Sequence, residues 1–127
     1  MSKAAKRYGS VIKLNADKVA EYKALHASVW PAVLARLEKS NVRNYTIYYC
    51  AQLGLLFSHF EYIGEDFDGD MSAVGEDPVT KDWWKVCEPC QSPLNWEGPP
   101  PSEGGKGDWW QPMEEVFHDG HPASGYQ

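Results

Sequence analysis

The sequence has no excess of positive charge, no long apolar run and few cysteines. Its 127 residues carry a formal net charge of -6, which argues against binding nucleic acid or an anionic membrane, because both select basic patches. No run approaches the roughly 20 apolar residues that a membrane-spanning helix needs. The segment MSKAAKRYGS is basic, but no apolar stretch follows it, so we expect no signal peptide.

Three cysteines is an odd number, which disfavours the disulfide framework of small secreted domains. We therefore expect a cytoplasmic protein. Cys87-x-x-Cys90 and His118-x-x-His121 together resemble a zinc-binding set, but the histidine spacing is one residue shorter than usual. We predict no metal site here and interpret the two cysteines as unrelated to metal binding.

The acidic segment DFDGDMSAVGED, residues 66–77, is similar to a calcium-binding loop at its first three odd positions. Its sixth position holds Met71, where that loop needs glycine, and its twelfth holds Asp77, where the loop needs glutamate. We therefore interpret the segment as a solvated acidic loop with only a weak apolar pattern.

Apolar periodicity and turn residues divide the chain into the elements of one domain, residues 1–127. Runs of β-branched and aromatic residues predict strands, and apolar residues at helical spacing predict helices. The predicted strands are Tyr8–Leu14, Val42–Cys50, Leu55–Ile63 and Met113–His118, and the predicted helices are Ala16–Val29, a stretch from Pro31 to about Ser40, and Val79–Val86. The order β, α, β, β, α, β is that of a ferredoxin-like α+β fold, with a four-stranded antiparallel sheet and helices on one face.

One face of such a sheet has no helices to cover it. A second copy of the chain is the simplest cover, so we expect a homodimer that forms a dimeric α+β barrel. Proline, glycine and serine dominate residues 91–112, which predicts an insert without regular structure. The tail after residue 119 is expected to be mobile.

Six tryptophans and seven tyrosines are the unusual feature of the composition. Tyr22, His26 and Trp30 are four residues apart and line one face of the predicted first helix. Histidine is the commonest proton-transfer side chain near neutral pH, and a tyrosine one turn away can bind a ligand or orient the imidazole. A core histidine without a catalytic role is the commoner explanation of such a position, and these residues leave both explanations open.

The adjacent residues Trp83 and Trp84 lie in a predicted helix and point about 100° apart, so they cannot both face the core. We expect one to be buried, which leaves the other available to the apolar face of a sugar. If Tyr45 projects from its strand onto the first helix, polar-tipped side chains converge on a small pocket that suits a polyol.

Four motifs occur in one order between Arg7 and Asp119: EYKALHASVWP, NYTIYY, WWK and EEVFH. With the element order, they resemble the L-rhamnose mutarotase family. The resemblance implies small homodimers of ferredoxin-like subunits that interconvert the α and β anomers of a 6-deoxyhexose without a cofactor. It implies His26 as the proton donor. It also implies that the sugar is bound by Tyr22, Tyr45, Trp83 and Trp84.

Two other functions are compatible with these residues. A non-catalytic sugar-binding or interaction domain would keep the same side chains. Another small α+β-barrel enzyme, acting on an aromatic substrate, would share the fold, because one fold hosts many chemistries. A cavity walled only by apolar side chains would favour the second of these.

Overall fold

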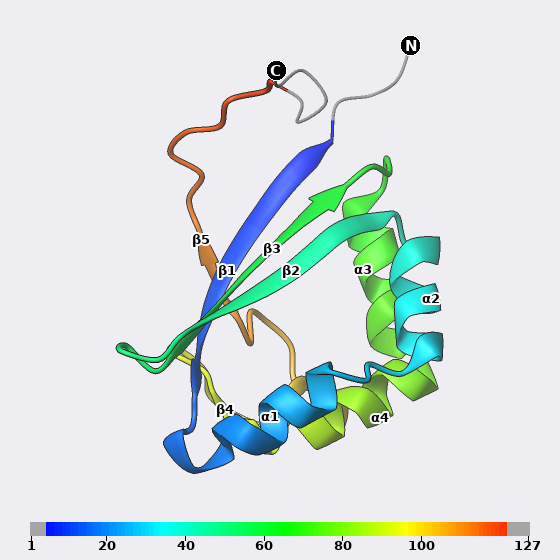
Figure 1. Cartoon of the computed structure of the whole chain (residues 1–127). Coiled ribbons are helices and arrows are strands. Elements are labelled where there is room, and N and C mark those ends of the chain that lie inside the picture. The colour runs from blue at the N-terminus through cyan, green and yellow to red at the C-terminus, as the bar shows by residue number, and fades with distance from the viewer. Residues whose placement is uncertain (1–4, 122–127) are drawn as a thin grey trace.

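The computed structural model describes residues 5–121, in which a curled antiparallel sheet carries helices on one face (Figure 1). The strands are β1 (Lys6–Leu14), β2 (Val42–Cys50), β3 (Leu55–Tyr62), β4 (Gln91–Ser92) and β5 (Gln111–Met113). The helices are α1 (Val19–His26), α2 (Pro31–Lys39), α3 (Phe67–Glu76) and α4 (Pro78–Cys87), with 3-10 turns at Ala16–Lys18, Glu88–Cys90 and Pro101–Glu103. The predicted α+β class is confirmed.

Strand β1 has neighbours on both of its edges. β3 pairs with it antiparallel along almost its whole length, and β2 continues the sheet beyond β3. β4 and β5 pair with the other edge of β1, β4 at the end of β1 and β5 at its middle. The order β2, β3, β1, β4 is the ferredoxin-like arrangement, and two short strands share its fourth position.

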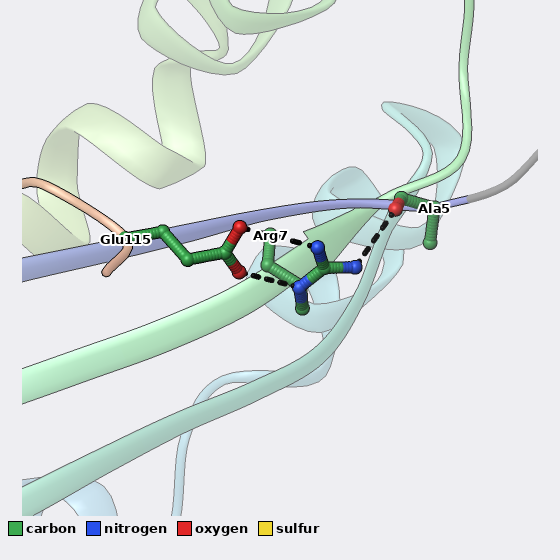
Figure 2. A network of polar contacts seen from close by, with 3 residues as sticks. All are labelled: Ala5, Arg7 and Glu115. Atoms are coloured by element: carbon green, nitrogen blue, oxygen red, sulfur yellow. Dashed lines mark hydrogen bonds and ion pairs between the residues drawn. The ribbon is translucent and has the colours of Figure 1, made fainter. Parts of the chain in front are cut away.

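The predicted final strand, Met113–His118, is wrong. The strand that pairs with β1 is Gln111–Met113, and residues 114–121 form neither helix nor strand. Arg7 of β1 instead holds this segment through a two-pronged ion pair with Glu115, with Nε to Oε1 at 2.6 Å and Nη2 to Oε2 at 3.2 Å (Figure 2). A side-chain contact therefore replaces the backbone ladder after β5.

The predicted first helix, Ala16–Val29, is shorter in the structure. A 3-10 turn precedes α1, α1 ends at His26, and α2 begins with Pro31 as its first residue. Proline has no N–H to donate and suits the first helical position. The predicted restart of the helix at Pro31 is confirmed.

The acidic segment is a helix, so the prediction of a loop there is wrong. The side chain of Asp66 caps α3 by accepting a hydrogen bond from the backbone N–H of Gly69 at 3.1 Å. Asp68 and Asp70 lie in the first turn, where negative charge stabilises the positive end of a helix. The carboxylates that resemble calcium ligands in the sequence thus stabilise the first turn of a helix.

The core lies between one face of the sheet and the helices, all of which gather on that side in Figure 1. Its buried members are Ile12, Leu14, Tyr22, Val33, Leu56, Trp83, Cys87 and Cys90. Because side chains alternate along a strand, the neighbours of Ile12 and Leu56 point to the opposite, outer face. Within residues 5–121, no helix has both the length and the apolar character needed to cross a membrane.

The hydrogen bonds to the Asp70 carboxylate predict a contribution to the stability of the fold that depends on pH. The Tyr62 hydroxyl, and then the Asn41 side-chain amide at 2.9 Å, donate to its Oδ2 and hold the pKa of Asp70 below its ordinary value of 3.8. A pKa that is lower in the folded state stabilises fully above the unfolded value and is lost as the pH falls through the folded value. We expect Asp70→Asn to lower the urea midpoint at pH 7, and this difference to shrink below about pH 4.

Asp68→Asn is the matched control, because it removes the same charge from the same helical turn. The Asp68 carboxylate makes no hydrogen bond within the described part of the chain. An equal effect of the two substitutions, or a difference that does not change with pH, would contradict the prediction.

Candidate active site

A cleft of about 290 Å³ lies between α1 and the helix-facing side of the sheet. Its lining comes from α1, with Tyr22, Lys23, His26 and Ala27, and from the strands, with Leu14, Ile47, Tyr49 and Leu56. A mostly apolar wall with a few polar groups is the usual composition of a small-ligand site, and the volume lies near the lower end for such sites. Two predicted site residues, Tyr22 and His26, therefore share one cleft.

The imidazole of His26 is held in one tautomer. Its Nδ1 lies 3.0 Å from the backbone carbonyl oxygen of Tyr22. A carbonyl oxygen only accepts, so Nδ1 carries the hydrogen and Nε2 is the basic nitrogen of the neutral ring. Burial lowers the pKa of His26 below its ordinary 6.5, although the backbone hydrogen bond acts in the opposite direction. The neutral form, with a basic Nε2, therefore predominates at neutral pH.

Aromatic rings support the imidazole of His26 on two sides. The Tyr22 ring stacks on it, with centroids 4.1 Å apart, and Trp83 meets it edge-on at 5.2 Å. Trp83 meets Trp30 edge-on at the same distance. Trp83 is only 6% exposed, so it is the buried member of the tryptophan pair, and it supports His26 from behind without lining the cleft.

Trp84 points to another side of α4. It is partly buried against the core, and a Cβ on Gly75 of α3 would lie 3.8 Å from its indole. The angle between adjacent helical residues explains why it diverges from Trp83. The structure does not place Trp84 in the lining of the cleft.

Tyr45 follows a β-bulge in β2. The pairing of β2 with β3 shifts by one residue between Arg43 and Thr46, and Asn44 takes a φ of 52° there. Asparagine tolerates this left-handed conformation, and a bulge re-aims the side chains beside it. The Tyr45 ring stacks on Phe60 of β3, with centroids 5.7 Å apart. Beyond the bulge, Ile47 and Tyr49 of β2 lie on the face that lines the cleft.

Tyr45 is 43% exposed and is not among the residues that line the cleft. It is close enough to Tyr22 and Cys87 for electrostatic interaction. Burial raises the pKa of Tyr45 to about 12 and also raises the pKa of Tyr22 above its usual range. Both residues are therefore neutral phenols at neutral pH, each able to donate or accept a hydrogen bond.

Sequence reasoning missed Lys23 and Tyr49 in the cleft, and Gln91 beside it. The Lys23 Nζ lies 5.5 Å from the centroid of the Tyr49 ring, a cation–π contact. Tyr49 belongs to the same strand face as Tyr45, so the alternation of β2 was the signal that could have found it. Gln91 donates from Nε2 to the Tyr22 hydroxyl at 3.2 Å, and no local pattern marks it.

The cysteines show no sign of metal binding. In the range 5–121, no three histidine, cysteine or acidic side chains are grouped so that they could hold a metal ion. All three cysteines are free thiols, and burial raises the pKa of Cys87 to about 12 and that of Cys90 to about 11. Both thiols are therefore protonated at neutral pH.

Two solved structures resemble this fold. The L-rhamnose mutarotase from Formosa agariphila is 23% identical, with a TM-score of 0.67 over 90% of this chain and 98% of that one. Tetracenomycin F2 cyclase from Streptomyces glaucescens is 14% identical, with a TM-score of 0.62 over 93% of this chain and 100% of that one. At these identities the likeness concerns the fold alone.

The sequence comparisons identify the family. An L-rhamnose mutarotase from Oceanobacillus iheyensis is 28% identical over 113 residues, 89% of this chain and 97% of the relative. One from Lactiplantibacillus plantarum is 29% identical over 112 residues, 88% of this chain and 96% of the relative. The sequence model of the family described as L-rhamnose mutarotase matches residues 7–119. Because this match spans nearly the whole chain, the protein belongs to the L-rhamnose mutarotase family.

Proposed function

We propose that this sugar mutarotase interconverts the α and β anomers of L-rhamnose or a related 6-deoxyhexose by acid–base opening of the sugar ring. His26 transfers the proton, and the sugar is held by Tyr22, Tyr45, Trp83 and Trp84. The observation that carries the proposal is the His26 imidazole at the cleft, with Nδ1 bonded to a carbonyl oxygen and Nε2 left as a base.

The chemistry needs one group that both takes and returns a proton. Neutral Nε2 of His26 accepts the proton of the anomeric hydroxyl as the bond from C1 to the ring oxygen breaks and C1 becomes an aldehyde carbon. The imidazolium then donates that proton to the former ring oxygen. Rotation about the C1–C2 bond and the reverse transfers close the ring on the other face of C1. Apart from the bond between C1 and the ring oxygen, which breaks and forms again, the reaction only transfers protons. We therefore propose that no cofactor takes part.

The neutral phenols suit an uncharged sugar. The hydroxyl groups of Tyr22 and Tyr45 can each pair with a sugar hydroxyl. Trp83 holds the imidazole at a fixed angle. Tyr45, Trp83 and Trp84 lie outside the present cleft lining, so their contact with sugar requires the substrate to extend beyond this lining or the side chains to turn.

We expect His26→Ala to lower the rate of anomer exchange by at least about 10²-fold, because general acid–base catalysis contributes that much or more. Sugar affinity should fall less, since the tyrosines remain. NMR saturation transfer between the two anomeric protons measures the exchange, with the uncatalysed rate subtracted.

His121→Ala is the matched control, because that side chain is 87% exposed and, among residues 5–121, bonds only to nearby Asp119. If His26 is only a packed core residue, His26→Ala would lower the melting temperature while the folded fraction kept its rate. A protein that binds sugar without exchanging its anomers would be a binding domain.

The rate should depend on pH through the basic form of His26. Its pKa is lowered from 6.5 by burial, so the base persists at neutral pH and is lost only as the pH falls below that value. We expect kcat/KM to be flat near pH 7 and to fall on the acidic side of pH 6.5. A rate that rises on acidification would show that imidazolium is the active form.

We also propose a homodimer formed through the outer face of the sheet. The register places Val11, Phe57 and Tyr48 in one row across this face, and Tyr48 is 66% exposed. Val116 and Phe117, beside the outer-face residue pair Arg7–Glu115, are 90% and 83% exposed. Exposed apolar side chains on a sheet face without helices favour a self-complementary interface.

Sedimentation at micromolar concentration should give twice the chain mass of 14.3 kDa. Tyr48→Glu places a charge in the proposed interface, so we expect it to yield monomers. Leu34→Glu is the control, since Leu34 is 53% exposed on α2, a helix that covers the other face. A monomeric unmodified protein, or dissociation by both substitutions, would contradict the proposal.

The free cysteines indicate the cellular compartment of the protein. Three free cysteines, two of them buried, are typical of a reducing environment. We therefore propose a cytoplasmic location.

A further inference from the structure

The side chain of Gln91 connects the sugar cleft to the Pro/Gly-rich segment. Its Nε2 donates to the Tyr22 hydroxyl at 3.2 Å, and its Oε1 accepts from the Trp109 indole Nε1 at 2.8 Å. Gln91 is 9% exposed. Both ends of a buried amide are therefore satisfied, one by α1 and one by a residue 18 positions along the chain.

The direction of these bonds follows from the chemistry of the three groups. An indole N–H only donates, so the Gln91 oxygen must face Trp109 and the Gln91 amino group must face Tyr22. The Tyr22 oxygen is then an acceptor, and its own hydrogen is not used in this bond. Within residues 5–121, the structure gives the Tyr22 hydroxyl no other hydrogen bond.

The backbone of Gln91 is fixed at the sheet edge. Gln91 pairs with Leu14 of β1. The hydroxyl group of the following residue, Ser92, donates from Oγ to Asn15 Oδ1 at 2.6 Å. Asn15 is the N-cap residue of the 3-10 turn before α1, but its side chain makes no cap hydrogen bond and donates to the Pro89 carbonyl oxygen instead. The Asn15 side chain thus anchors β4.

Trp109 is held by its own segment. Its ring meets Trp96 edge-on at 5.2 Å, and the Trp96 Nε1 donates to the Pro99 carbonyl oxygen at 3.1 Å. Trp109 also packs against the buried core. The segment predicted as an insert therefore delivers an indole N–H to a fixed position beside the cleft.

We propose that Gln91 and Trp109 are positioning residues that turn the Tyr22 hydroxyl hydrogen toward the sugar, so that Tyr22 binds a sugar oxygen as a donor. The inference rests on the proposed function, in which Tyr22 contacts the sugar. It adds a role for the Pro/Gly-rich segment, which completes the binding site by orienting one amide.

Gln91→Glu tests the direction of the bond. A carboxylate accepts from both Trp109 and Tyr22, so it keeps the shape of the site but draws the Tyr22 hydrogen away from the sugar. We expect the Kd for L-rhamnose to rise about 3- to 10-fold, as for loss of one hydrogen bond, with kcat changed little. Tyr22→Phe should give the same rise, and the double variant no further rise, because both remove one interaction.

Trp109→Phe is a second, milder variant. It keeps a ring against Trp96 but removes the N–H that orients the amide, so we expect a smaller rise in Kd, roughly 2- to 3-fold. Gln52→Glu is the control, since it adds the same charge at an exposed position in the turn between β2 and β3. NMR titration with L-rhamnose gives the Kd, and saturation transfer on the same samples gives the exchange rate.

The outcomes separate the two proposals. Unchanged Kd in Gln91→Glu beside a raised Kd in Tyr22→Phe, or additive effects in the double variant, overturns the positioning role. A lowered melting temperature with unchanged Kd assigns Gln91 a structural role and also overturns it. If the unmodified protein binds L-rhamnose without exchanging its anomers, the mutarotase chemistry fails, while the Kd comparison still decides the role of Gln91. If the unmodified protein does not bind L-rhamnose at all, the inference is overturned directly.

Discussion

Backbone pairing along both edges of β1 is the constraint on which the rest of the structure depends. β3 occupies one edge and β4 with β5 the other, so segments from the middle and the end of the chain meet beside Leu14. This pairing sets Gln91 next to the start of the first helical turn and within reach of Tyr22. It also curls the sheet around α1, because paired strands twist. The cleft lies where α1 crosses this curled surface.

The site combines rigidity with groups that can still exchange protons. Tyr22 is 4% exposed, and its ring, Trp83 and a backbone carbonyl all restrict the imidazole of His26. Burial shifts the two pKa values in opposite directions, lowering that of His26 and raising that of Tyr22, because it disfavours both the imidazolium and the phenolate. Both residues are therefore neutral. In the proposed reaction, an uncharged sugar would meet neutral donors and acceptors, and the base would need no preceding deprotonation.

Several residues of the candidate site could be predicted from the sequence because they lie on one regular element. Tyr22 and His26 are one helical turn apart, so any helix there places them together. The restart at Pro31 follows equally from local chemistry. Trp83 and Trp84 show the limit of this approach: helical geometry predicts that one is buried, but only packing against His26 and Trp30 selects Trp83. Sharing a motif with Trp83 does not place Trp84 in the cleft.

The sequence by itself determined the α+β class, the order of the elements and the helical face that carries Tyr22 and His26, because these depend on interactions between near neighbours in the chain. The start of the helix at residues 67–76 has a local signal in the Asp66 cap, but only the tertiary structure showed that Asp70 holds this helix to Tyr62 of β3 and to Asn41 in the turn before β2. The position of the last strand was likewise set by its register on β1. The bonds of Gln91 and the tautomer of His26 depend on which donors and acceptors meet in space, and no spacing along the chain specifies that.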